Sequence, residues 1–191
     1  MFPSSHDITP FNLKEYVRVA KLILAKGNRL LIVTKPCLEC VNVLLEELEL
    51  WRDQILLRFT IGSMVFSVCD FWEPGAPEPV ERLACLRAAY MAGYKTSVSI
   101  EPMLEGGAAA LDVILACRDY VTDDIWIGKM NKVRLRVDMT DRGVAAAVRQ
   151  IERLQSDNEI ITLYRRLAGT PMIQWKDSIK DVLARNDIAV E

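Results

Sequence analysis

The sequence lacks several features that would place it in a specialised class of protein. It contains no uninterrupted apolar run of about 18 residues, the length that a membrane-spanning helix needs. Its N-terminus, with Pro3, His6 and Asp7, lacks the basic-then-apolar order of a secretion signal. A formal net charge of -2 gives no overall positive field that would attract nucleic acid or an anionic membrane. We therefore expect a cytoplasmic protein that binds neither membrane nor nucleic acid.

Several catalytic and ligand-binding motifs are also absent. The sequence holds no G-x-G-x-x-G, no P-loop and no nucleophile elbow. An unrelated α/β enzyme with a phosphate or carboxylate site is therefore the least favoured interpretation. With a single histidine, His6, and no cysteine near it, a metal site there is not favoured, although its neighbour Asp7 leaves an acid–base role open. For Asp7 itself we favour a role as the cap of the helix that begins near Pro10 or Phe11.

The five cysteines are odd in number and scattered, which is typical of reduced thiols in the core and not of a disulfide framework. Cys37 and Cys40 form a C-x-x-C pair that invites a redox or metal interpretation. A metal site of this type needs a second cysteine or histidine pair at suitable spacing. We therefore favour a chance pair at a helix N-terminus, with one thiol packed and the other partly exposed.

Short apolar strands alternate with helical patterns along the chain. This alternation predicts an α/β fold built from right-handed βαβ units on a parallel sheet, either doubly wound or part of a barrel. A hydrophobic content of 51% over 191 residues suits a single domain, residues 1–191. We expect strands at 29–34, 54–61, 95–100, 124–128 and 172–175, and helices at 11–27, 38–51, 80–92, 108–120, 143–167 and 178–185.

Residues 1 to 3 read as the close of one further strand, which gives about six in total. A complete eight-stranded barrel typically needs about 250 residues, so roughly two βα units are missing, and we place that deficit at the N-terminal end. The predicted fold is an incomplete parallel (β/α) barrel of the TIM-barrel type.

Polar residues follow each expected strand at once, and the carboxyl ends of parallel strands form the rim where ligands bind. Lys35 is placed to hold a carboxylate or phosphate, or else is an exposed loop lysine. Glu101 either binds an amino group or sugar hydroxyls, or pairs with a neighbouring Lys or Arg. The other rim residues are Ser4, Ser5, His6, Asp7, Thr34, Thr60, Ser63, Lys129 and Asn131.

The segment FWEPGAPEPVERLACLRAAYMAGYKTSVSIEPML, residues 71–104, resembles the radical S-adenosylmethionine proteins related to spore photoproduct lyase. That group shows an E-P-x-A-P turn, an E-R helix start, an A-G helix end and a strand leading to Pro. The matching residues here are Glu73, Pro74, Ala76, Pro77, Glu81, Arg82, Ala92, Gly93 and Pro102. VTKP at 33–36 and FPSSHDITP at 2–10 also resemble strand ends of the group, and beyond about residue 130 only the topology is similar.

The resemblance implies a barrel that binds a [4Fe-4S] cluster and S-adenosylmethionine, and that forms a 5′-deoxyadenosyl radical. It implies that Lys35, Ser5 and Ser63 hold the methionine part of S-adenosylmethionine, with Lys35 toward the carboxylate. Thr60 and Glu101 are weaker candidates on the same rim.

The sequence departs from this family because it contains no C-x-x-x-C-x-x-C triplet and no glycine-rich second strand. A site-differentiated cluster needs three thiolates from the protein. The leading hypothesis is a truncated member of the family that lacks catalytic activity by itself, with no cofactor expected for this chain alone. The alternative is a barrel subunit that joins another copy, or a separately encoded N-terminal half, through an open strand edge near residues 1 to 4 and so forms a radical S-adenosylmethionine enzyme.

Overall fold

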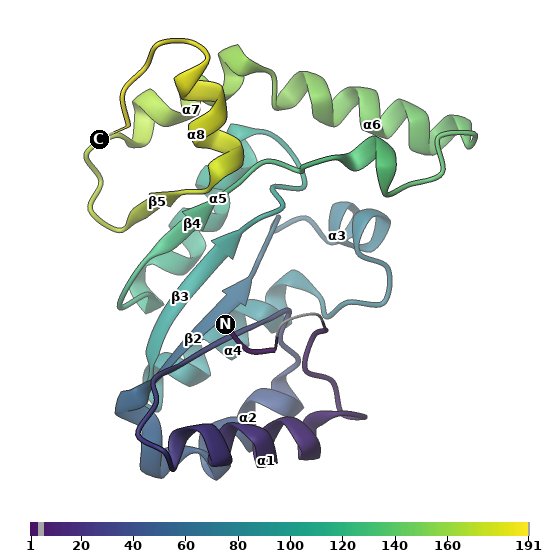
Figure 1. Cartoon of the computed structure of the whole chain (residues 1–191). Helices are drawn as coiled ribbons and strands as arrows, with labels where there is room; N and C mark the ends of the chain where they lie inside the picture. Colours follow the sequence, from purple (N-terminus) through teal and green to yellow (C-terminus); the bar gives the residue numbers. More distant parts are fainter. Residues whose placement is uncertain (4–5, 191) are drawn as a thin grey trace.

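A computed structural model describes residues 1–3 and 6–190, in which helices and strands alternate along the chain (Figure 1). The elements in chain order are α1 (Leu13–Leu24), β1 (Leu30–Thr34), α2 (Leu38–Glu47), η1 (Glu49–Gln54), β2 (Ile55–Thr60), α3 (Phe66–Trp72), α4 (Pro79–Met91), β3 (Lys95–Ile100), α5 (Gly107–Cys117), η2 (Arg118–Tyr120), β4 (Ile125–Ile127), η3 (Val133–Leu135), α6 (Arg142–Leu154), α7 (Asp157–Leu167), β5 (Ile173–Trp175) and α8 (Asp177–Ala184).

The strands form one parallel sheet in which they lie in sequence order, β1-β2-β3-β4-β5. Each strand therefore lies beside the next one along the chain, and the order never reverses as it does in a doubly wound sheet. The predicted α/β class with a parallel sheet is confirmed, and the open sheet fits a partial barrel.

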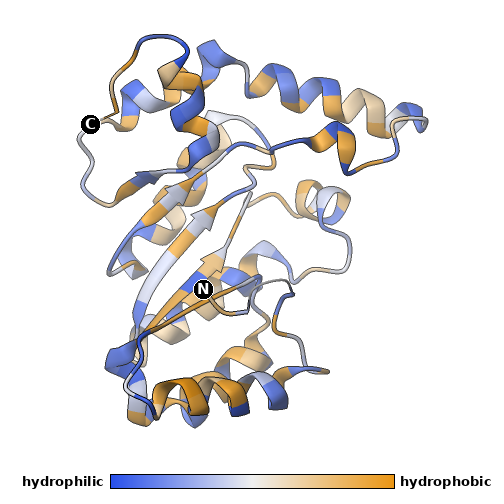
Figure 2. Ribbon diagram, in the orientation of Figure 1, coloured by the Kyte–Doolittle hydropathy of each residue, from blue (hydrophilic) through white to orange (hydrophobic). Residues whose placement is uncertain are grey.

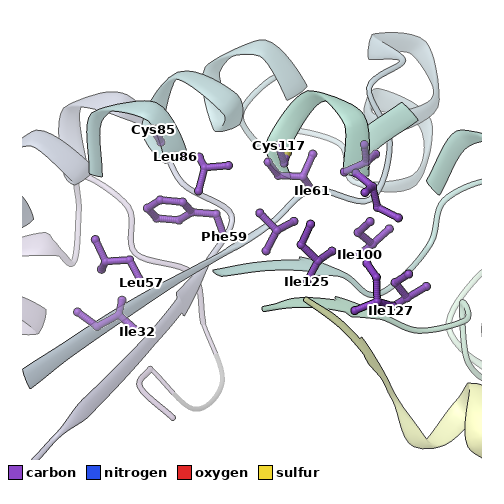
Figure 3. Close-up of a cluster of buried hydrophobic side chains, with 14 of the residues drawn as sticks. Ile32, Leu57, Phe59, Ile61, Cys85, Leu86, Ile100, Cys117, Ile125 and Ile127 are labelled. Carbon is purple, nitrogen blue, oxygen red and sulfur yellow. The ribbon is translucent and has the colours of Figure 1, made fainter. Parts of the chain in front are cut away.

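Helices cover one face of the sheet, and the main hydrophobic core lies between these helices and the sheet (Figure 3). Ile32, Leu57 and Phe59 of the strands are at most 2% exposed, and Cys85 of α4 and Cys117 of α5 are fully buried beside them. Burying each large apolar side chain stabilises the fold by roughly 1.5–3 kcal/mol. In Figure 1, α4 and α5 lie behind the sheet, and Figure 2 shows hydrophobic residues along β1 and β2 and hydrophilic residues along α6 and α7.

The predicted number of strands is wrong, because the described residues contribute five strands and not six. Phe2 makes only an isolated parallel bridge to Ile32, with its N–H donating to Leu31 and its carbonyl accepting from Val33. Pro3 has no N–H with which to continue a ladder. Residues 1–3 therefore lie against the edge of β1 without forming a strand.

Two predictions for the helices are also wrong. Residues 66–72, for which no helix was expected, form the seven-residue helix α3. The single helix expected at 143–167 is two helices, α6 and α7, which separate at Gln155 and Ser156. Elsewhere the expected helices and strands are present with bounds shifted by a few residues. In the part of the chain that the structure describes, every helix is too short or too polar to cross a membrane.

The loops that follow β2 and β3 pack closely at Gly62. A Cβ at this position would lie 2.6 Å from the carbonyl oxygen of Pro102, which is backbone and cannot easily move. The N–H of Leu104 donates to the carbonyl of Gly62 at 3.2 Å. Only glycine allows this approach, which fixes two neighbouring loops at the carboxyl ends of the strands.

Candidate functional site

A cavity of about 840 Å³ opens at the carboxyl ends of the first strands. Its volume lies within the roughly 300–1,000 Å³ that is typical of small-molecule sites. Three loops bound it: residues 7–11 before α1, residues 73–77 between α3 and α4, and residues 130–137 after β4. Its wall combines apolar side chains, such as Trp72 and Leu104, with several charged groups.

Four charged side chains of alternating sign lie in a row beside this cavity. Lys35 Nζ is 3.3 Å from Asp7 Oδ2 and 3.9 Å from Glu73 Oε1. Arg82 Nη1 is 2.7 Å from Glu73 Oε2. The side chains of Asp7 and Lys35 are 38% and 27% exposed, whereas those of Glu73 and Arg82 are 8% and 1% exposed. The outer pair is therefore open to a ligand, and the inner pair is part of the protein interior.

Asp7 reaches this position because the segment before α1 is bonded to the end of β1. Its Oδ1 accepts the backbone N–H of Lys35 at 2.6 Å and the hydroxyl of Thr34 at 3.2 Å, while Thr34 Oγ1 accepts the N–H of Ile8 at 3.1 Å. The prediction that Asp7 caps the first helix is wrong: α1 begins at Leu13, and the Asp7 carboxylate bonds to β1 instead.

Arg82 holds the turn at residues 73–77 against the sheet. Its Nε donates to the carbonyl of Pro77 at 2.7 Å, and its Nη1 donates to the carbonyl of Thr60 at 3.3 Å as well as to Glu73. Sequence reasoning missed this role, although an arginine within the buried face of an otherwise apolar helix was a signal for it. A fully buried guanidinium requires an acidic partner, and Glu73 supplies it.

Among the predicted binding residues that the structure describes, Lys35 alone lies in the cavity wall. Ser63 is fully buried and donates its hydroxyl to Glu105 at 2.6 Å. Thr60 is 8% exposed and lies at the end of β2, outside the cavity wall. Ser5 lies outside the described residues.

Glu101 also lies away from the cavity wall, and its carboxylate is 2.9 Å from Lys176 Nζ. The predicted alternative that Glu101 pairs with a neighbouring basic residue therefore holds in the structure. Lys176 Nζ also lies 5.2 Å from the centre of the Trp126 ring, within the range of a cation–π contact.

A second polar group lies at Arg58, which alternates along β2 with the core residues Leu57 and Phe59 and so points to the opposite face. Arg58 donates to Ser97 at 2.7 Å and to Asp124 at 2.8 Å, and its guanidinium lies 5.1 Å from the Trp126 ring. The sequence did not predict this group, because the apolar strands indicated a sheet whose two faces are both buried.

The cysteines lie within helices or at their starts, and all five are free thiols. Four are buried, and only Cys37 is partly exposed, as predicted for the C-x-x-C pair. Burial is the main cause that raises the pKa of Cys40, Cys85 and Cys117 to about 12. Among residues 1–3 and 6–190, no group of three or more His, Cys, Asp or Glu side chains is arranged to hold a metal ion.

The chain is similar in sequence to a viral protein and in fold to a bacterial one. No protein-family model matches the chain. The protein named "Uncharacterized protein ORF301" of Acidianus two-tailed virus is 31% identical over 116 residues, which are 59% of this chain and 37% of that protein. The chain therefore spans little more than a third of the length of this relative.

The solved structure of SuiB from Streptococcus suis aligns with 92% of this chain and 40% of its own chain, with a TM-score of 0.59 and 10% sequence identity. SuiB bound to S-adenosylmethionine aligns with 91% of this chain and 45% of its own, with a TM-score of 0.43 and 11% identity. SuiB bound to the precursor peptide SuiA aligns with 93% of this chain and 40% of its own, with a TM-score of 0.43 and 10% identity. At this low identity, the first of these alignments establishes that the chain shares the fold of part of SuiB.

Proposed function

We propose that this chain is part of a radical S-adenosylmethionine-type barrel, and that its rim cavity binds the amino acid end of S-adenosylmethionine. The observation that carries the proposal is the partly exposed pair of Asp7 and Lys35 in the cavity wall. The likeness of residues 71–104 to the spore photoproduct lyase-related group supports it. Further support comes from SuiB, which binds S-adenosylmethionine and of which one part has the fold of this chain.

The charges of the outer pair suit a zwitterion. An α-amino acid presents a carboxylate and an ammonium close together, and Lys35 and Asp7 present the complementary charges 3.3 Å apart. Lys35 would donate hydrogen bonds to the ligand carboxylate, and Asp7 would accept them from the ligand ammonium, while Arg82 neutralises Glu73 behind them. The apolar side chains of Trp72 and Leu104 in the same wall would contact the less polar part of the ligand.

In the family that the sequence resembles, S-adenosylmethionine reduced by a [4Fe-4S] cluster supplies a 5′-deoxyadenosyl radical. The cysteines of this chain do not fit such a cluster. Only Cys37 lies at the cavity, and Cys40 and Cys85 beside it are at most 1% exposed, with pKa values raised to about 12 that favour the protonated thiol. We therefore propose that this chain binds S-adenosylmethionine without cleaving it.

Completion of the barrel by another copy, or by a separately encoded half, stays a prediction. Residues 1–3 cover only part of the β1 edge, through the single bridge of Phe2. Light scattering measures the oligomeric state of the protein. A clean monomer at high concentration would count against association with another copy.

Equilibrium dialysis with labelled S-adenosylmethionine tests the binding site. Lys35→Met should weaken binding about tenfold or more, equivalent to about 1.4 kcal/mol or more, because it removes the cation that faces the ligand carboxylate. Lys26→Met, at an exposed position beyond the end of α1, is the matched control and should leave the affinity unchanged.

A second ligand makes the test specific for the amino acid end. 5′-Methylthioadenosine, which lacks that end, should bind the wild-type protein and Lys35→Met equally. Equal affinity of both proteins for S-adenosylmethionine, or a loss of affinity for both ligands in Lys35→Met, would contradict the proposed pose.

A further inference from the structure

The first turn of α2 carries two thiols that the proposed function does not use. Cys37 is the N-cap of this ten-residue helix, with extended backbone angles, and Cys40 follows three residues later. Residues at this spacing lie on the same side of a helix. The start of α2 therefore carries two cysteines on the same side of the helix.

The two thiols differ in their access to solvent. Cys37 is partly exposed and lines the 840 Å³ cavity, whereas Cys40 is 1% exposed and packs in the core. Burial, followed by the hydrogen bond with Cys37, raises the pKa of Cys40 to about 12. A reagent that enters the cavity can therefore reach Cys37, whereas Cys40 is shielded from it.

A third thiol, Cys85, belongs to α4, the helix that packs against α2. Cys85 is fully buried in the core between α4 and the sheet (Figure 3). It is outside the cavity wall and belongs to a different helix. Its position makes it a natural internal control for the pair at the start of α2.

We propose that Cys37 and Cys40 form a redox-active dithiol that exchanges with low-molecular-weight disulfides that enter the cavity. The Cys37 thiol loses its proton, and its sulfur attacks one sulfur of the disulfide. The S–S bond of the reagent breaks, a mixed disulfide forms, and the first reagent sulfur leaves as a thiol that carries this proton. The thiol of Cys40 then attacks the Cys37 sulfur, its proton passes to the second leaving sulfur, and the Cys37–Cys40 disulfide closes. Two protein thiols are oxidised, and one reagent disulfide is reduced to two thiols.

The experiment exposes the reduced protein to oxidised glutathione, quenches the reaction with acid, blocks free thiols with N-ethylmaleimide and maps the products by mass spectrometry. The wild-type protein should hold a disulfide within the peptide that carries Cys37 and Cys40. In Cys40→Ser the reaction should stop at the mixed disulfide, so the glutathione adduct on Cys37 should be about tenfold more abundant than in wild type.

The two remaining variants complete the test. Cys37→Ser should form neither product, and Cys85→Ser should behave as wild type, because Cys85 takes no part. A glutathione adduct in wild type as abundant as in Cys40→Ser would overturn the proposal. A disulfide mapped to Cys85, or a Cys37 that does not react, would overturn it as well. The outcome does not depend on whether the cavity binds S-adenosylmethionine.

Discussion

Arg82 shows how a single residue shapes the cavity wall. Its guanidinium joins α4 to the turn at residues 73–77 and to the end of β2, through Glu73, Pro77 and Thr60. Its Nη2 is buried without a hydrogen-bond partner among the described residues. Burying this charge is costly, and the ion pair with Glu73 offsets that cost only while both partners are present.

Arg82→Met should therefore lower the free energy of unfolding by about 3–5 kcal/mol, because it leaves the Glu73 carboxylate buried without its partner. Arg87→Met on the same helix is the matched control. Arg87 is exposed and lies 4.8 Å from the Tyr120 ring, a contact worth about 0.5–1 kcal/mol. Urea denaturation measures both variants, and equal losses in the two would show that the buried pair does not hold the turn.

At this scale the sequence could predict the positions of rim residues but not their partners. Lys35 was predicted at the rim because it follows a buried strand, and it does line the cavity. That Asp7 would turn toward Lys35, and that Ser63 would be buried against Glu105, depends on loop paths that join residues 28 and 42 positions apart. Local patterns carry no information on such contacts.

The break between α6 and α7 is the main feature that appears at the scale of elements. Gln155 ends α6 with non-helical angles, and its side chain is 3% exposed. Its amide nitrogen donates to the carbonyls of Met103 and Glu105 at 2.9 and 2.7 Å, and its amide oxygen accepts the N–H of Met130 at 2.8 Å. One side chain thus connects the loops that follow β3 and β4.

Gln155→Ala should lower the free energy of unfolding by about 2–4 kcal/mol, because it leaves buried backbone groups of two loops unsatisfied. Gln150→Ala, at an exposed position of α6, should change it by no more than about 0.5 kcal/mol. Thermal or urea denaturation of the two variants checks this. A small loss in Gln155→Ala would mean that water replaces the amide and that the loops do not depend on it.

The periodicity of residues 143–167 continues through this break, which is why a single helix was predicted. The helix α3 was missed for the opposite reason: it has seven residues, and its Phe66 and Phe71 are 55% and 47% exposed, so no buried stripe appears in the sequence. The positions of the strands were predicted more accurately than those of the helices, because short apolar runs between helices are typical of parallel sheets.

At the scale of the whole molecule, the sequence order of the strands brings the ends of β1 and β2 to one edge, where the cavity opens. Alternating strands and helices predicted this class of fold, but the number of strands depends on whether residues 1–3 pair beyond one bridge, which no local pattern decides. Under the proposed function, this chain binds S-adenosylmethionine at the cavity, and its own cysteines do not hold a cluster.

The most direct test of binding without cleavage is to measure whether S-adenosylmethionine stays intact in the presence of the protein. The protein is reconstituted with iron and sulfide, reduced with dithionite and incubated with S-adenosylmethionine, and 5′-deoxyadenosine is quantified by chromatography. The account predicts that the ligand binds and is recovered intact, with no more 5′-deoxyadenosine than in a reaction without protein. Several equivalents of 5′-deoxyadenosine per protein molecule would contradict it.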